Sequence, residues 1–79
     1  MPANLNAIVG TNVRISRKRL GLNQDEFADK CGLHRTYIGA VERGERNITL
    51  ETLQRIAAAL EVSPLLLLSP NADLSPRNS

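Results

Sequence analysis

The sequence predicts an all-α protein, a compact bundle of five short helices. Apolar residues recur at spacings of three and four along most of the chain, and no stretch alternates between apolar and polar residues as a half-buried strand would. Glycines, prolines and capping residues divide this pattern into five segments of helical length. With 79 residues, we expect one domain at residues 1–69, followed by a flexible polar tail at residues 70–79.

The first predicted helix ends at Gly21. The residues that recur at spacings of three and four on its inward face are Leu5, Ile8, Val9, Val13, Ser16 and Leu20. Asn23 is then expected to cap a second helix at about residues 24–30, because its side-chain oxygen can accept a hydrogen bond from the first turn. Gly32 can adopt the positive φ that ends such a helix.

The three remaining helices have similar boundary signals. The third spans about residues 34–43 and is closed by Gly44. Thr49 caps the fourth, whose apolar stripe consists of Leu50, Leu53, Ile56, Ala57 and Leu60. The fifth begins near Pro64, because proline fits the first turn of a helix, and it stops before Pro70.

The composition argues against an enzyme and against a bound metal or cofactor. Cys31 is the single cysteine and His34 the single histidine, so the chain has neither a disulfide pair nor a zinc ligand set. We expect Cys31 to be a small buried side chain. No carboxylate pair has catalytic spacing. We also expect a cytoplasmic protein without a membrane partner, since the apolar run at residues 65–68 is far below the roughly 20 residues that span a bilayer.

The segment from Gln24 to Arg43 predicts a helix-turn-helix. Its apolar positions are Phe27, Cys31, Leu33, Ile38 and Val41. On two short helices that cross steeply, these side chains converge beneath the turn, while Ala28 lets the helices approach and Gly32 lets the chain reverse. The second helix of such a motif can enter the major groove of DNA. An ordinary helical hairpin within a small bundle is the alternative.

The outer face of the third helix is suited to DNA bases. This face is predicted to carry Arg35, Thr36, Gly39, Ala40 and Arg43. The first turn normally meets base edges; there, arginine can donate two hydrogen bonds to guanine, and threonine can contact a base or a thymine methyl. The small Gly39 and Ala40 would let the helix lie deep in the groove. For Tyr37, packing at the edge of the core and a contact with DNA are equally open.

Other polar residues suit the DNA backbone. Gln24 begins the second helix, where an amide side chain and free backbone N–H groups can hold a phosphate. Arg46 and Asn47 follow the third helix and suit phosphate or additional base contacts. For Arg46, a solvated pairing with Glu45 is the alternative. Basic residues also gather at 14–19, where a solvated basic face is the alternative.

The run RKRLGLNQDEFADKCGLHRTYIGAVERGERNITLETLQRIAAALEV resembles the Xre/Cro-type helix-turn-helix domain of phage repressors, a lambda-repressor-like DNA-binding domain. The resemblance covers about residues 13–68. Within it, CGLHRTYIGAVERGERN is particularly similar to controller proteins of restriction-modification systems. These are small homodimeric regulators that bind palindromic double-stranded DNA operators and control their own gene and the endonuclease gene. The resemblance implies DNA contacts by Gln24, Arg35, Thr36, Tyr37, Arg43, Arg46 and Asn47.

The same resemblance assigns Arg17 and Glu42 to a buried ion pair between the first and third helices. Arg14 and Lys18 then remain as weaker candidates for the DNA backbone. In a regulator that activates transcription, RNA polymerase is a further expected partner, and related activators use the second helix for this contact. The candidate residues there are Asp25, Glu26 and Asp29, although acids in a first turn are also commonplace for dipole reasons.

Four consecutive leucines predict an interface. Residues 65–68 lie in one short helix and cannot all face one small core, so some should project outward. We predict a two-fold symmetric homodimer through the fourth and fifth helices. Its interface residues are Leu53, Leu60, Leu65, Leu66, Leu67 and Leu68. The alternatives to a controller are an antitoxin whose partner is a toxin protein, and a phage-type repressor.

Overall fold

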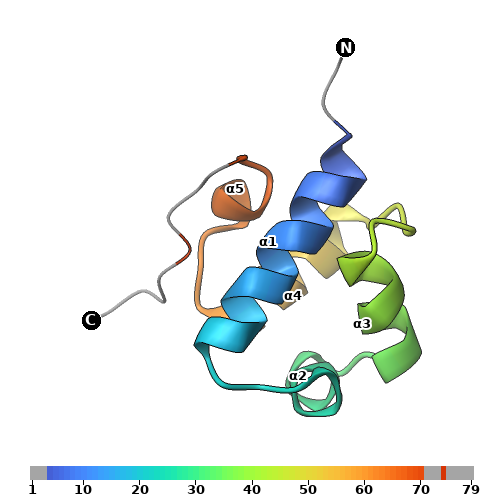
Figure 1. Cartoon of the computed structure of the whole chain (residues 1–79), viewed down its shortest axis with the longest axis vertical. Coiled ribbons are helices and arrows are strands. Elements are labelled where there is room, and N and C mark those ends of the chain that lie inside the picture. The colour runs from blue at the N-terminus through green and yellow to red at the C-terminus, as the bar shows by residue number, and fades with distance from the viewer. Residues whose placement is uncertain (1–3, 71–73, 75–79) are drawn as a thin grey trace.

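The five predicted helices are all present in the computed structural model, which describes residues 4–70 and Leu74 (Figure 1). They are α1 Leu5–Arg19, α2 Gln24–Cys31, α3 Arg35–Glu42, α4 Leu50–Leu60 and α5 Pro64–Leu67. Within these described residues every regular element is a helix, and none is long and apolar enough to cross a membrane. The predicted all-α class is therefore confirmed.

Capping side chains explain where most of the helices begin. Asn4, Asn23 and Thr49 accept hydrogen bonds from backbone N–H groups in the first turns of α1, α2 and α4. At α2 this is a capping box, because the side chain of Glu26 also accepts from the backbone N–H of Asn23 at 2.8 Å. Gly32 ends α2 with a φ of 71°, which permits the sharp turn into α3.

The core is aliphatic except for one phenylalanine. The largest completely buried side chains are Phe27, Ile38, Ile56, Leu60, Leu67 and Val13, so every helix contributes to the same cluster. Cys31 lies in this core, and burial raises the pKa of its thiol to about 11. It is therefore protonated and unreactive near neutral pH, as expected for a small core side chain.

α1 is the central element of the bundle. Figure 1 shows it between α5 and α3, with α4 behind, and it contacts all three. Its contact with α3 is so close that a Cβ added to Gly10 would lie 2.4 Å from the carbonyl oxygen of Val41. On the other side, the buried Asn12 holds α5, since its Nδ2 donates to the carbonyls of Leu67 at 2.9 Å and Ser69 at 3.0 Å.

The structure corrects part of the predicted interface. Leu60 and Leu67 are completely buried within the single chain and Leu53 is buried as well, so these three belong to the core and leave no surface for a partner. Leu66 and Leu68 are half-buried against the same core. Leu65 is 73% exposed, so it is the leucine of α5 that projects outward.

Most of the predicted tail at residues 70–79 lies outside the described residues. Leu74 is described, and it is only 3% exposed. The Leu74 side chain is therefore withdrawn from water, which the expectation of a loose polar tail did not include.

Candidate DNA interface

The first turn of α3 is open to an incoming ligand. His34 is its N-cap residue, but the His34 side chain makes no capping hydrogen bond, and no acid lies in this turn. Arg35 and Thr36 are exposed, and Tyr37 is half-buried. The positive end of the helix dipole and its free N–H groups therefore face solvent beside an arginine and a hydroxyl, which suits a phosphate or the edge of a base.

Arg35 is held by a residue of α2. Its Nε lies 3.2 Å from Oδ1 of Asp25, and the two side chains are 64% and 71% exposed. An ion pair this exposed is weak and screened by salt, so it does not prevent the guanidinium from making other contacts. The sequence predicts Asp25 as a candidate contact for RNA polymerase or a first-turn acid, and it does not predict the pairing with Arg35.

Tyr37 and Arg46 form a stacked pair. The tyrosine ring packs against the edge of the core, and the guanidinium carbon of Arg46 lies 5.0 Å from the ring centroid. This is a cation–π arrangement. The alternative of an Arg46–Glu45 pair is wrong, because Glu45 Oε2 instead lies 3.1 Å from Nε of Arg43.

Asn47 is positioned by a side chain at the start of α1. Asn6 of α1 donates from Nδ2 to Oδ1 of Asn47 at 2.7 Å, across 41 positions of sequence. With its oxygen engaged, Asn47 keeps its own amide N–H groups as donors for an acceptor on DNA. No motif marks Asn6, since the contact exists only because the loop after α3 folds onto the start of α1.

The ion pair implied by the resemblance is present between α1 and α3. Arg17 donates from Nε to Glu42 Oε2 at 2.6 Å and from Nη2 to Oε1 at 3.0 Å. A third hydrogen bond runs from Nη1 of Arg17 to the Leu22 carbonyl at 2.8 Å. The arginine and glutamate side chains are only 8% and 4% exposed. This bidentate, almost dry geometry makes Arg17 a structural residue of the helix-turn-helix.

Gln24 is partly engaged by the same network. Its Nε2 donates to Oε1 of Glu42 at 3.1 Å. A phosphate contact by Gln24 would therefore use its second amide hydrogen or its backbone N–H at the start of α2. Gly39 is buried, and a Cβ added to it would lie 3.2 Å from Nη1 of Arg43 and 3.7 Å from Oε1 of Gln24. Gly39 therefore lies on this face but is covered by the side chains of Gln24 and Arg43 rather than bare to solvent.

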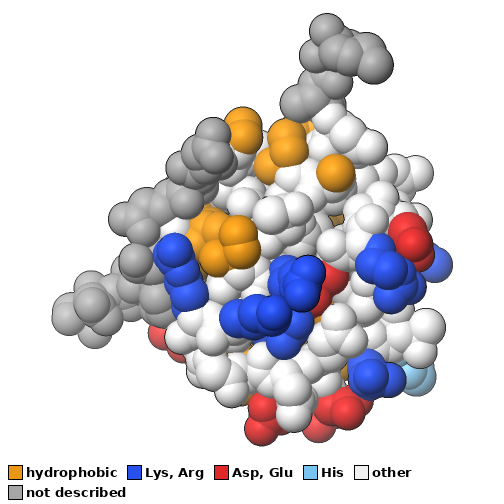
Figure 2. All heavy atoms as spheres, viewed as in Figure 1, with side chains coloured by type: hydrophobic (Ala, Val, Ile, Leu, Met, Phe, Trp, Pro, Cys, Tyr) orange, Lys and Arg blue, Asp and Glu red, His pale blue; other side chains and the backbone are white. Residues whose placement is uncertain are grey.

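Basic side chains from two helices meet around this network. A hollow of about 340 Å³ is lined by Arg14, Arg17, Lys18, Gln24, Gly39, Glu42 and Arg43. Figure 2 shows Lys and Arg side chains gathered across this face, over α1 and beside α3, with Asp and Glu mostly at the lower edge near α2. The net charge is only +2, so the positive field comes from this local arrangement. Such a face suits a polyanion such as DNA.

Comparison with known families identifies the domain. A helix-turn-helix family model (HTH_3) matches residues 13–67. The chain belongs to this family. Its members are DNA-binding transcription regulators and not enzymes.

Two relatives illustrate the similarity. Control protein C.SmaI of Serratia marcescens is 51% identical over 65 residues, which cover 81% of this chain and 77% of that protein. A hypothetical transcription factor of Neisseria meningitidis serogroup B is 45% identical over 67 residues, or 85% of this chain. The chain spans 63% of the length of that Neisseria protein.

Solved structures share the fold. The crystal structure of a hypothetical transcription factor from Neisseria superimposes with a TM-score of 0.82 and 42% identity, over 90% of this chain and 84% of that one. The restriction-modification controller protein C.Esp1396I, solved as a tetramer with its natural 35 base-pair operator, gives a TM-score of 0.74 and 35% identity, over 84% of this chain and 87% of that one. The chain is thus a helix-turn-helix transcription regulator related to restriction-modification controller proteins.

Proposed function

We propose that this protein controls restriction-modification genes, including its own, by binding a palindromic operator as a homodimer with α3 in the major groove. The observation that carries the proposal is the first turn of α3, where Arg35 and Thr36 are exposed about one turn before Gly39, which lines the basic hollow between α1 and α3. In a helix-turn-helix this turn meets base edges while neighbouring basic groups hold the backbone. The operator complex of C.Esp1396I supports the same use of the fold.

Different residues then have different tasks in this complex. Arg35 and Thr36 read bases, and the stacked pair of Tyr37 and Arg46 lies beside them at the edge of the groove. Residues around the basic hollow and in the loop after α3 contact the phosphates. These are Gln24, Arg43 and Asn47, with Arg14 and Lys18 further along α1. Arg17 and Glu42 keep α1 and α3 in register.

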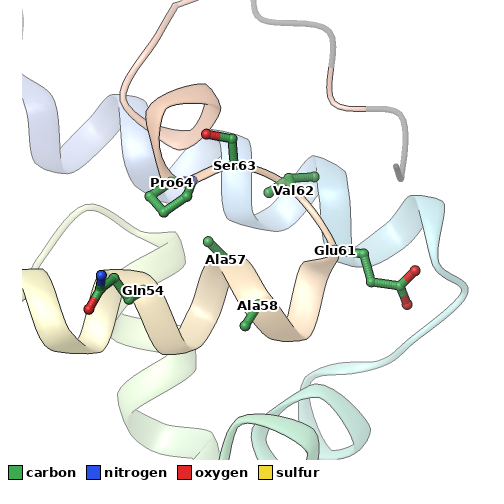
Figure 3. Close-up of a pocket in the computed structure, with 7 residues that line it drawn as sticks. All are labelled: Gln54, Ala57, Ala58, Glu61, Val62, Ser63 and Pro64. Atoms are coloured by element: carbon green, nitrogen blue, oxygen red, sulfur yellow. The ribbon is translucent and has the colours of Figure 1, made fainter. Parts of the chain in front are cut away.

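We place the dimer surface on the outer side of α4 and α5. A hollow of about 590 Å³ lies there (Figure 3), with Ala57 and Ala58 of α4 on one side and Pro64 on the other. Leu65 follows Pro64 and is exposed, as is Leu50, one turn before Gln54 on α4. Small side chains next to exposed leucines would let α4 and α5 of a second copy approach closely and bury the exposed apolar surface.

Contact with RNA polymerase stays a prediction for α2. Asp25 lies against Arg35, and Glu26 completes the capping box. Asp29, which is exposed and lies one turn later, is the acid of α2 outside these two interactions. A polymerase contact would therefore involve Asp29 without disturbing either the cap or the base-reading turn.

The proposal is tested by selecting preferred sites from random double-stranded DNA with the purified wild-type protein. We expect enrichment of an inverted repeat whose half-sites lie about 10 base pairs apart from centre to centre, the spacing at which two recognition helices face the same side of the duplex. Analytical ultracentrifugation of the complex should give two chains for each inverted repeat. Enrichment of no sequence, or of an isolated half-site bound by one chain, would overturn the proposal.

A further inference from the structure

We propose that Asp25 is a specificity-determining residue that positions Arg35 for base reading without itself binding DNA. The inference rests on the proposed function of α3 and deepens it. The pairing spans the two helices of the motif, from the first turn of α2 to the first turn of α3. Asp25 is therefore placed to act on the reading side chain from outside the recognition helix.

The geometry of the pair leaves the reading edge of Arg35 free. Asp25 Oδ1 approaches Nε, at 3.2 Å, which is the nitrogen nearest the aliphatic stem. A guanidinium carries one N–H on Nε and two on each Nη. Two of these donors are needed for guanine O6 and N7, and the Nη pair can supply them while Nε stays on the carboxylate. Arg35 can therefore hold Asp25 and a guanine at once.

The pair affects binding in two opposite ways. A solvent-exposed arginine samples many rotamers and loses that freedom when it binds, so a partner that restricts it beforehand favours the specific contact. The attraction also grows in the groove, where water is excluded and the local dielectric falls. At the same time, a carboxylate near the phosphates disfavours every DNA sequence equally. Asp25 should therefore weaken non-specific binding and strengthen discrimination at one base pair.

A role in helix capping does not account for Asp25. The α2 N-terminus is already capped by Asn23, whose side chain accepts from the backbone N–H of Glu26, and by Glu26, whose side chain accepts from the backbone N–H of Asn23. Asp25 adds a favourable dipole interaction at most, and Asp25→Asn retains the size and shape of the side chain. The variant is thus expected to fold, which melting curves would verify before any binding measurement.

Asp29→Asn is the matched control. It removes the same charge from the same helix, and Asp29 is exposed and one turn away from Asp25. Both variants should bind arbitrary DNA more tightly than the wild type, because each removes one negative charge. Only Asp25→Asn should change how well Arg35 distinguishes its base pair.

The experiment measures binding to the selected operator, to operators with each half-site base pair replaced in turn, and to arbitrary duplex, at one fixed salt concentration. The pair read by Arg35 is the one at which Arg35→Ala loses discrimination. At that base pair, wild type and Asp29→Asn should bind the selected operator about 5- to 150-fold more tightly than the operator with the pair replaced. This is the discrimination expected from one bidentate arginine–guanine contact. Asp25→Asn should lose several-fold of this ratio and keep its discrimination elsewhere.

Two results would overturn the inference and are distinguishable. If Asp25→Asn keeps the wild-type ratio at that base pair, Asp25 acts only as a surface charge, and the proposed function of α3 stands. If the wild type itself shows no preference at any base pair, the base-reading role of α3 fails, and the inference fails with it.

Discussion

Arg17 shows why charge in a sequence does not reveal the role of a residue. It belongs to a basic run with Arg14, Lys18 and Arg19, and composition alone makes all four equal candidates for the DNA backbone. In the structure, Arg17 is turned inward onto Glu42 and the Leu22 carbonyl. Resemblance to repressors predicted this pair; composition could not, because burial depends on how α1 crosses α3.

We predict that Arg17→Ala loses about 3–5 kcal/mol of free energy of unfolding, because it leaves the Glu42 carboxylate buried without its cation. Thermal or chemical denaturation measures this loss. Arg43→Ala is the control, because it removes an exposed partner of Glu45 and should lower the free energy of unfolding by less than about 1 kcal/mol. Equal melting curves for Arg17→Ala and wild type would show that the ion pair contributes nothing to the fold.

At the scale of helices, local sequence was sufficient for the boundaries and insufficient for the contacts. Apolar spacing and the caps Asn23 and Thr49 are properties of a few neighbouring residues, and they predicted all five helices. Gly10 looked like any helical glycine, and its role is visible only where α1 meets α3. The exposed contacts Asn6–Asn47 and Asp25–Arg35 likewise depend on how the helices are arranged.

We predict that Gly10→Ala destabilises the protein although alanine normally favours a helix by up to about 1 kcal/mol over glycine. The added methyl would lie 2.4 Å from the Val41 carbonyl oxygen, so α1 and α3 must separate. Gly39→Ala is the matched control within α3, because the atom nearest its added Cβ is the mobile end of Arg43. A melting temperature of Gly10→Ala at or above that of Gly39→Ala would contradict this packing.

At the scale of the whole molecule, a single chain of 79 residues is a small domain that buries a modest share of its surface. The four leucines at 65–68 suggested a common interface, yet their burial differs, because α5 turns one side onto the core and the other outward. Periodicity could not resolve this in a helix of one turn. The proposed dimer therefore depends on exposed Leu65 and the adjoining hollow of α4.

We predict that the wild type sediments as a dimer at micromolar concentration and that Leu65→Glu sediments as a monomer with unchanged helical content. Placing a charge on the proposed contact would bury it without a partner. The control is Leu5→Glu, which alters an exposed leucine on α1, away from the proposed interface, and this variant should remain dimeric. A dimeric Leu65→Glu protein would move the interface elsewhere.

The most direct test of α3 as a base-reading helix is competition binding of wild type and Arg35→Ala to the DNA immediately upstream of the protein's own gene. Both proteins are measured at the same salt concentration against shuffled duplex of identical composition. The wild type should prefer its upstream DNA, and Arg35→Ala should lose about 1–3 kcal/mol of that preference while melting at the wild-type temperature. If Arg35→Ala retains the full preference, α3 does not read sequence through this residue, and the assignment of the DNA interface is wrong.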